Sequence, residues 1–165
     1  MPTPLSASLN FPADPATTYA LVTDSGYVHA VAEATGGERI DVSVEDTAEG
    51  GAVVTSRREL PAQVPSYAKA LVGDRLRLVE VRTYGPAAED GARTGEVKVN
   101  FDGVPVTIQG VLTLGAQGDG SVITLEASVR ASIPFVGGKI ERFAADEVIR
   151  FLHKETEVAQ DRLGH

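Results

Sequence analysis

The chain of 165 residues is 42% hydrophobic, carries a formal net charge of −8 at pH 7 and contains no cysteine. This composition excludes a disordered chain, disulfide bonds and thiol chemistry, and no apolar run approaches the roughly 18 residues of a transmembrane helix. The negative charge, without any basic cluster, argues against nucleic-acid binding. We therefore expect one domain over residues 1–165 without stable membrane insertion, as a monomer or homodimer, and cytoplasmic because the N-terminus lacks a signal-peptide pattern.

The N-terminal part of the sequence predicts one strand followed by two short helices. Apolar residues alternate with polar ones from Leu5 to Phe11, which is the pattern of a half-buried strand. Asp14 is a good helix N-cap, and Pro15 after it begins a helix that ends near Val22. After a turn at residues 23–26, a second short helix is expected over residues 27–34.

The middle of the sequence switches to the period-two pattern of strands. Turn residues at 49–51 and the Asp102-Gly103 pair indicate hairpins between neighbouring strands. The expected strands are residues 40–45, 52–60, 75–84, 94–101, 104–114 and 121–131. Residues 61–73 and 85–95 interrupt this pattern, the first as a short helix or ordered loop and the second as a mobile loop.

The C-terminal part predicts one long helix over residues 135–163. Its apolar residues recur at three-four spacing, and they are Val136, Ile140, Phe143, Ala144, Val148, Phe151, Leu152, Ala159 and Leu163. Such a helix is about 43 Å long, whereas a compact chain of this size has a radius of gyration of only about 15 Å. The helix must therefore lie along an equally long surface, and a curved antiparallel sheet is the surface that the strands can supply.

This element order, with the approach to the last helix at residues 133–141 (Ile-Pro-Phe-Val-Gly-Gly-Lys-Ile-Glu), resembles the START-like, helix-grip superfamily. That group includes lipid-transfer domains, pollen-allergen-like proteins and polyketide cyclases, and the chain looks most like a small uncharacterised bacterial family within it. The resemblance implies an α+β fold in which about seven antiparallel strands curve around the long helix. It also implies a cavity between sheet and helix that holds a hydrophobic ligand such as a lipid, isoprenoid or polyketide-like compound.

Several residues are candidates for contact with such a ligand. Tyr27 and His29 lie on the second short helix, which lines one cavity entrance in the superfamily. Phe101 and Tyr84 are sparse aromatic residues of the strands, and the small side chain of Ala144 could widen the cavity. No spacing of histidines suits a metal, and nothing in the sequence indicates a cofactor.

Charged residues inside the expected strands leave two interpretations open. If Leu78 and Tyr84 face inward, Glu80 and Arg82 share their face, but inward-facing Val79 and Val81 would place both charges in solvent. The same question applies to Arg58 and Glu126. A charge inside the cavity would need a partner or a ligand, because an unpaired buried charge costs several kcal/mol.

Three functions follow from these candidates. The leading hypothesis is a non-enzymatic binding module for a hydrophobic molecule. A cyclase or hydratase-like enzyme would instead need a buried acid or base, for which Glu80, Glu126 and His29 are the candidates. A partner-binding protein would have a filled core. We also expect residues 61–73 to act as a lid over the cavity, with Tyr67 packed towards it.

Overall fold

The computed structural model describes residues 2–164, which form seven strands and four helices. The strands are β1 (Thr3–Phe11), β2 (Glu38–Asp46), β3 (Ala52–Pro61), β4 (Arg75–Tyr84), β5 (Arg93–Phe101), β6 (Val104–Gln117) and β7 (Gly120–Ala131). The helices are α1 (Pro15–Val22), α2 (Ser25–Ala34), α3 (Ser66–Val72) and α4 (Gly137–Leu163). None of these helices is long and apolar enough to cross a membrane.

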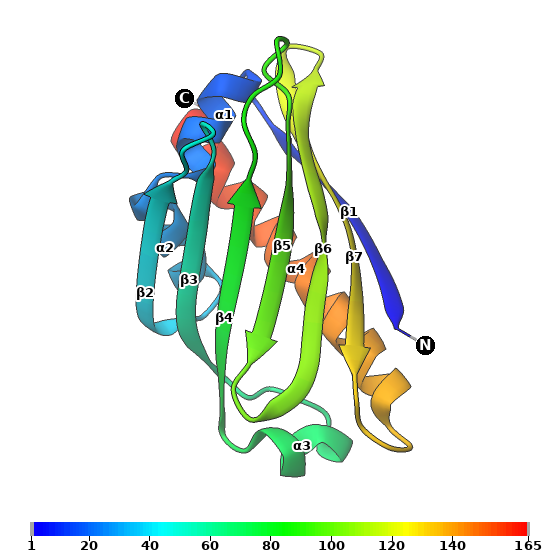
Figure 1. Ribbon diagram of the computed structural model, residues 1–165. Coiled ribbons are helices and arrows are strands. Elements are labelled where there is room, and N and C mark those ends of the chain that lie inside the picture. Colours follow the sequence, from blue (N-terminus) through cyan, green and yellow to red (C-terminus); the bar gives the residue numbers. More distant parts are fainter. Residues whose placement is uncertain (1, 165) are drawn as a thin grey trace.

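The strands form one antiparallel sheet in the order β1-β7-β6-β5-β4-β3-β2. Figure 1 shows the sheet curving around α4, which runs along its concave face and contacts β1, β7 and α2. Helix α2 lies beside α4 over β2 and β3, and α3 closes the opposite end of the sheet between β3 and β4. The predicted α+β helix-grip fold is therefore confirmed.

Strand alternation places one apolar row of each strand on the concave face. The buried residues of the last strand, for example, alternate from Ser121 through Ile123 and Leu125 to Val129. The two-residue hairpin between β5 and β6 turns at Gly103, whose φ of 70° suits glycine. This regular pattern supplies the inner wall of the space that α4 covers.

The two N-terminal helices begin at aspartate caps. Asp14 accepts a hydrogen bond from the backbone N–H of Thr17, and hydrogen bonding by the side chain and then the backbone of Thr17 lowers the pKa of its carboxyl group. Asp24 caps α2 in the same way through the N–H of Tyr27, so α2 begins at Ser25 rather than at Tyr27. The start predicted for this helix was two residues late, because Asp24 and Ser25 were interpreted as turn residues.

Helix α4 begins at Gly137, two residues later than predicted. Phe135 is fully exposed and has a φ of 70°, which lies outside the α-helical range, so the helix begins only after this residue. A Cβ at Gly137 would stand 2.9 Å from the carbonyl oxygen of Ala131, and glycine therefore permits the close approach of helix and sheet. Glu141 fixes this approach, since its carboxylate accepts hydrogen bonds from the backbone N–H of Ala131 and the hydroxyl of Thr3.

Candidate functional site

A cavity of about 410 Å³ lies between the concave face of the sheet and the helices α2, α3 and α4. Its walls are predominantly aliphatic and aromatic side chains. They include Val28, Val31, Val54, Leu60, Leu76, Leu78, Val99, Phe101, Val106, Ile108, Ile140, Phe143, Ala144, Val148 and Phe151. Such walls bind apolar molecules by removing their surface from water.

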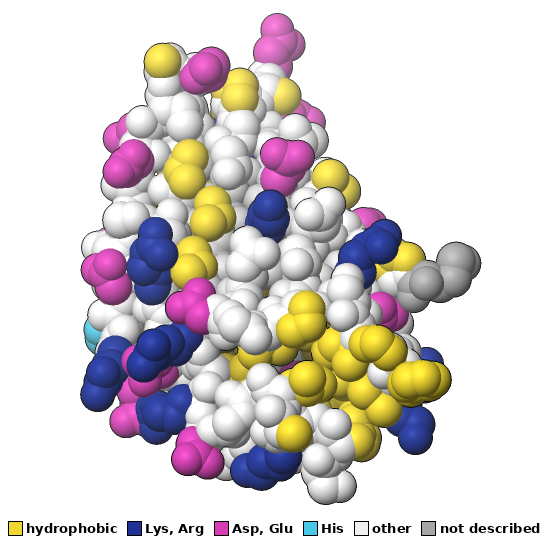
Figure 2. All heavy atoms as spheres, turned by 60° about the horizontal axis from the view of Figure 1, so that its bottom comes forward, with side chains coloured by type: hydrophobic (Ala, Val, Ile, Leu, Met, Phe, Trp, Pro, Cys, Tyr) yellow, Lys and Arg dark blue, Asp and Glu magenta, His cyan; other side chains and the backbone are white. Residues whose placement is uncertain are grey.

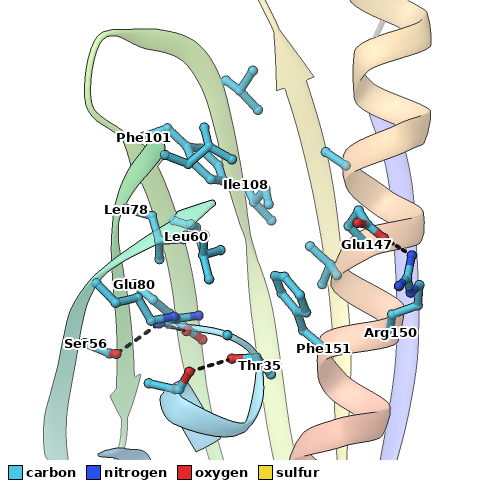
Figure 3. A pocket seen from close by; sticks show the side chains of 18 of the residues that line it. Thr35, Ser56, Leu60, Leu78, Glu80, Phe101, Ile108, Glu147, Arg150 and Phe151 are labelled. Carbon is cyan, nitrogen blue, oxygen red and sulfur yellow. Dashed lines mark hydrogen bonds and ion pairs between the residues drawn. The ribbon is translucent and has the colours of Figure 1, made fainter. Parts of the chain in front are cut away.

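The two ends of the cavity differ in polarity. Figure 3 shows Ser56, Glu80 and Thr35 near one end and Phe101 with Ile108 at the other. Phe151 extends into the space between them from α4. The buried charges of the cavity therefore lie at one end, and the more exposed ion pair of Glu147 and Arg150 in α4 borders the otherwise apolar wall.

The charged end consists of a chain of ion pairs across β3, β4 and α4. Arg82 donates from Nε to Glu80 at 2.7 Å and from Nη1 and Nη2 to the two carboxylate oxygens of Glu155, at 3.0 and 2.9 Å. Arg58 donates from Nη1 to the other oxygen of Glu80 at 3.2 Å and to the hydroxyl of Ser56 at 2.9 Å. Cross-strand pairing of Ser56 with Glu80 in β3 and β4 brings these groups together.

Burial and neighbouring charges have opposite effects on the pKa values of Glu80 and Arg82 in this ion-pair chain. Burial alone would raise the pKa of Glu80, but the guanidinium groups of Arg82 and Arg58 outweigh it and lower the pKa to about 2. Burial opposes the charged form of Arg82 as well, yet Glu155 and Glu80 raise its pKa. Burial also raises the pKa of Tyr27, whose hydroxyl donates to the backbone carbonyl of Glu155 at 3.3 Å. Glu80 and Arg82 are therefore both charged at neutral pH.

Six of the candidate residues line the cavity. Arg58, Glu80 and Arg82 face it from the strands, because the register is regular and places Leu78 and Tyr84 on the inner face. They are joined there by Tyr27, Phe101 and Ala144.

Two candidates point away from the cavity. Glu126 is exposed on the outer face of β7, between the buried Leu125 and the partly buried Ala127, and accepts a hydrogen bond from Ser6. His29 is also exposed and lies 3.4 Å from Glu33, because the helical period turns Tyr27 and Val31 inward and His29 outward. The assignment of both residues to the cavity was wrong.

Two aromatic candidates lie outside the cavity wall for different reasons. Tyr84 is fully buried but packs edge-on against Tyr19 of α1, with the ring centroids 5.7 Å apart. Tyr67 is 39% exposed, with the ammonium group of Lys139 5.8 Å from its ring centroid. In α3 the buried side chain that lines the cavity is Ala68, and Leu71 borders the cavity while 38% exposed, so the predicted inward packing of Tyr67 was wrong.

Comparison with known proteins identifies the family. Residues 6–163 match the family described as "Protein of unknown function (DUF2505)". The chain belongs to the DUF2505 family. A relative is the uncharacterized protein Rv0481c of Mycobacterium tuberculosis, which is 29% identical over 98 residues, or 58% of this chain and 56% of the relative. The match thus spans little more than half of the length of that mycobacterial protein.

Solved structures share the fold of this DUF2505 chain at low sequence identity. The ZhuI aromatase/cyclase of Streptomyces sp. R1128 has a TM-score of 0.61 at 11% identity, over 98% of this chain and 96% of that one. A STAR-related lipid transfer protein of Xanthomonas axonopodis has a TM-score of 0.57 at 16% identity, over 97% and 85% of the two chains. These similarities show the START-like helix-grip fold.

One member of the ion-pair chain of this DUF2505 protein escaped the sequence analysis. Glu155 is only 4% exposed and supplies the carboxylate that binds Arg82 from across the cavity. It follows Phe151 by four positions and precedes Ala159 by four, so it interrupts the apolar stripe of α4. A carboxylate within an apolar stripe is the signal that could have revealed it.

The surface near α3 of this acidic DUF2505 protein carries a cluster of apolar side chains. Figure 2 shows apolar side chains gathered on the face that corresponds to the lower end of Figure 1, bordered by Lys and Arg side chains. Tyr67 and Leu71 of α3, and Phe135 before α4, are large exposed apolar residues. This face lies at the end of the sheet where α3 lines the cavity.

Proposed function

We propose that this DUF2505 protein binds a hydrophobic small molecule in the cavity between the sheet and α4. The observation that carries the proposal is a cavity of about 410 Å³ with mostly apolar walls, where a filled core would leave no such space. Its volume falls within the range of roughly 300–1,000 Å³ that is common for small-molecule sites. The titles of two proteins with the same fold, a lipid transfer protein and an aromatase/cyclase, agree with a ligand of this class.

A variant that fills the cavity tests the proposal. Ala144 lines the cavity from α4, so Ala144→Phe would occupy the space that a ligand needs. We expect the purified protein to bind the apolar fluorescent probe N-phenyl-1-naphthylamine, and the variant to bind it at least about tenfold more weakly, since one well-placed aromatic group removes most of the contact area. Fluorescence titration measures both affinities.

Val111→Phe is the matched control, because Val111 is 53% exposed and is not part of the cavity wall. It adds a similar side chain outside the cavity and should leave probe binding unchanged. Equal binding by wild type and Ala144→Phe would show that the probe does not enter the cavity. Absence of binding, together with absence of any molecule in organic extracts of the purified protein, would favour a partner-binding role.

An enzymatic function finds less support in the cavity. A cyclase or hydratase needs an acid or base whose pKa lies near the working pH. Of the three groups considered, Glu80 alone lines the cavity, and its neighbouring arginines lower its pKa to about 2 despite its burial. A carboxylate in that state is a weak base and is already engaged in two ion pairs.

We propose that residues 61–73, which include α3, form the lid of the cavity. Val64, Ala68 and Leu71 of this segment line the cavity, so an opening of α3 would connect the interior with solvent. Backbone amides of residues 61–73 should exchange hydrogen faster than those of β3 and β4, and the bound probe should slow them most. Hydrogen-exchange mass spectrometry checks this. Equal protection of the segment and the strands, unchanged by the probe, would identify a fixed wall.

A further inference from the structure

Arg58 is incompletely paired within the charged end of the cavity. Its side chain is only 10% exposed, and it lines the cavity from β3. Its bonds to Ser56 and Glu80 both leave from Nη1. Nε is buried and has no partner in residues 2–164, and no described residue accepts a bond from Nη2. A buried donor without an acceptor is costly, and more so when it belongs to a charged group.

The other members of the ion-pair chain do not supply the missing acceptor, because their hydrogen bonds reach Arg58 only at Nη1. Both carboxylate oxygens of Glu80 are used, one by Arg58 and one by Arg82, and both oxygens of Glu155 accept from Arg82. Arg82, in contrast, donates from all three of its nitrogens. Arg58 is therefore the arginine of this network with nitrogens, Nε and Nη2, that donate to no described residue.

The positive and negative charges of the ion-pair chain are equal in number without a ligand. Arg58 and Arg82 face the two carboxylates of Glu80 and Glu155. A ligand carboxylate would add a third negative charge to this desolvated group, and a buried charge without its own partner is strongly unfavourable. A neutral oxygen acceptor would satisfy Arg58 without disturbing the balance.

We propose that the ligand is an apolar molecule with a neutral carbonyl oxygen, which accepts hydrogen bonds from Arg58 at the charged end of the cavity. This inference rests on the proposed binding function and specifies its ligand class. Because Phe101 and Ile108 lie at the other end, the apolar remainder of the molecule extends from Arg58 towards them. Ketones, aldehydes and esters with one aliphatic or aromatic tail meet this description.

Three probes with equal numbers of non-hydrogen atoms test the ligand class. They are 2-nonanone, 2-methyl-1-nonene, in which a methylene replaces the carbonyl oxygen, and octanoate. Displacement of N-phenyl-1-naphthylamine gives their affinities. A purely apolar cavity would reproduce the ratio at which ketone and alkene partition from water into hexane. We expect the ratio of ketone affinity to alkene affinity for the protein to exceed the hexane ratio roughly tenfold or more, because the ketone gains a hydrogen bond to a charged donor. Octanoate should bind more weakly than the ketone.

Variants of two arginines assign the effect to Arg58. Arg58→Lys keeps the charge beside Glu80 but removes the planar donor edge, so the ratio of ketone affinity to alkene affinity should fall to the hexane value. Arg57→Lys is the matched control on the exposed face of β3 and should keep the wild-type ratio. With ketone labelled at its carbonyl carbon, the ¹³C signal in the wild-type complex should lie downfield of its position in hexane.

The outcomes of these experiments distinguish failure of the carbonyl inference from failure of the proposed binding function. A hexane-like ratio in the wild type, tightest binding of octanoate, or a ratio that Arg58→Lys leaves unchanged would overturn the carbonyl inference while the alkene still binds. Failure of all three probes and of N-phenyl-1-naphthylamine would instead overturn the binding function itself. If Arg58→Lys does not fold, the affinity ratio and the ¹³C shift of the wild-type protein still decide the question.

Discussion

The two faces of β3 and β4 carry ion-pair networks of the same residue types in different surroundings. On the concave face, the members are between 5% and 19% exposed, and they are Arg58, Glu80, Arg82 and Glu155. On the convex face, Glu59 is 11% exposed beneath arginines that are 41% to 78% exposed, namely Arg39, Arg75 and Arg77. The carboxylate of Glu59 is thus covered mainly by the solvent-exposed arginine side chains that pair with it.

The comparison shows that residue type and pairing do not by themselves set the energetic role of a charge. Separating two charged partners that lie in solvent costs little free energy, because water and salt ions replace the interaction. Removing one partner of an ion pair enclosed by apolar walls costs much more free energy, because the remaining charge stays desolvated and unpaired. The inner network should therefore be essential for stability, and the outer network should contribute little.

The largest expected effect is the loss of one inner carboxylate. Glu155→Gln removes the charge that binds two nitrogens of Arg82, so we expect the free energy of unfolding to fall by about 3–5 kcal/mol. Urea unfolding measures it. Glu157→Gln is the control on the same helix, since Glu157 is 65% exposed and should change the free energy very little. Equal effects of Glu155→Gln and Glu157→Gln on the free energy of unfolding would contradict the claim that the buried ion pairs matter more for stability than the exposed ones.

The next effect is the pH dependence that the inner network imposes. The pKa of Glu80 is about 2 in the folded protein and 4.5 without these neighbours, so its stabilisation is complete above pH 4.5 and is lost as the pH falls towards 2. We expect wild type to lose about 2 to 3 kcal/mol more than Glu80→Gln across this interval. Chemical unfolding of both proteins at several pH values gives the difference. Parallel pH profiles would mean that the arginines do not stabilise the charged form of Glu80.

The smallest expected effect belongs to the outer network. Glu59→Gln should lower the unfolding midpoint by a small fraction of the effect of Glu155→Gln, and about 1 M NaCl should abolish the difference from wild type. The Glu155→Gln effect should persist at the same salt concentration, because the inner pairs are enclosed. Thermal unfolding with and without salt distinguishes the two. A salt-resistant effect at Glu59 would place the outer pairs in the same class as the inner ones.

Most elements of the fold could be predicted because their signals are local. Alternation identified the strands, and Asp102-Gly103 fixed a hairpin that requires a positive φ. Three-four spacing identified α4 to its last residue, Leu163. Its first residue was missed because the departure at Phe135 depends on how closely Gly137 approaches the sheet, which is a contact between distant parts of the chain.

The site was predictable only as a set of alternatives. Apolar residues on both faces of β4 left Glu80 and Arg82 without a defined direction in the sequence. In α3, Tyr67 was predicted to pack inward, but the docking of the helix turned the neighbouring Ala68 to the cavity and left Tyr67 exposed beside Lys139. Neither choice has a local cause, because each depends on which surface packs against the element.

The sequence by itself thus determined the order of elements, the curved antiparallel sheet and the long helix that crosses it, since periodicity and turn residues act over a few positions. Only the tertiary structure decided that Arg82 meets Glu155, a residue 73 positions away, and that Arg58 keeps unused donors beside an apolar cavity. The physical reason is that a buried charge is tolerable only beside its partner. That partner comes from another element, and its position exists only once the sheet has closed around α4.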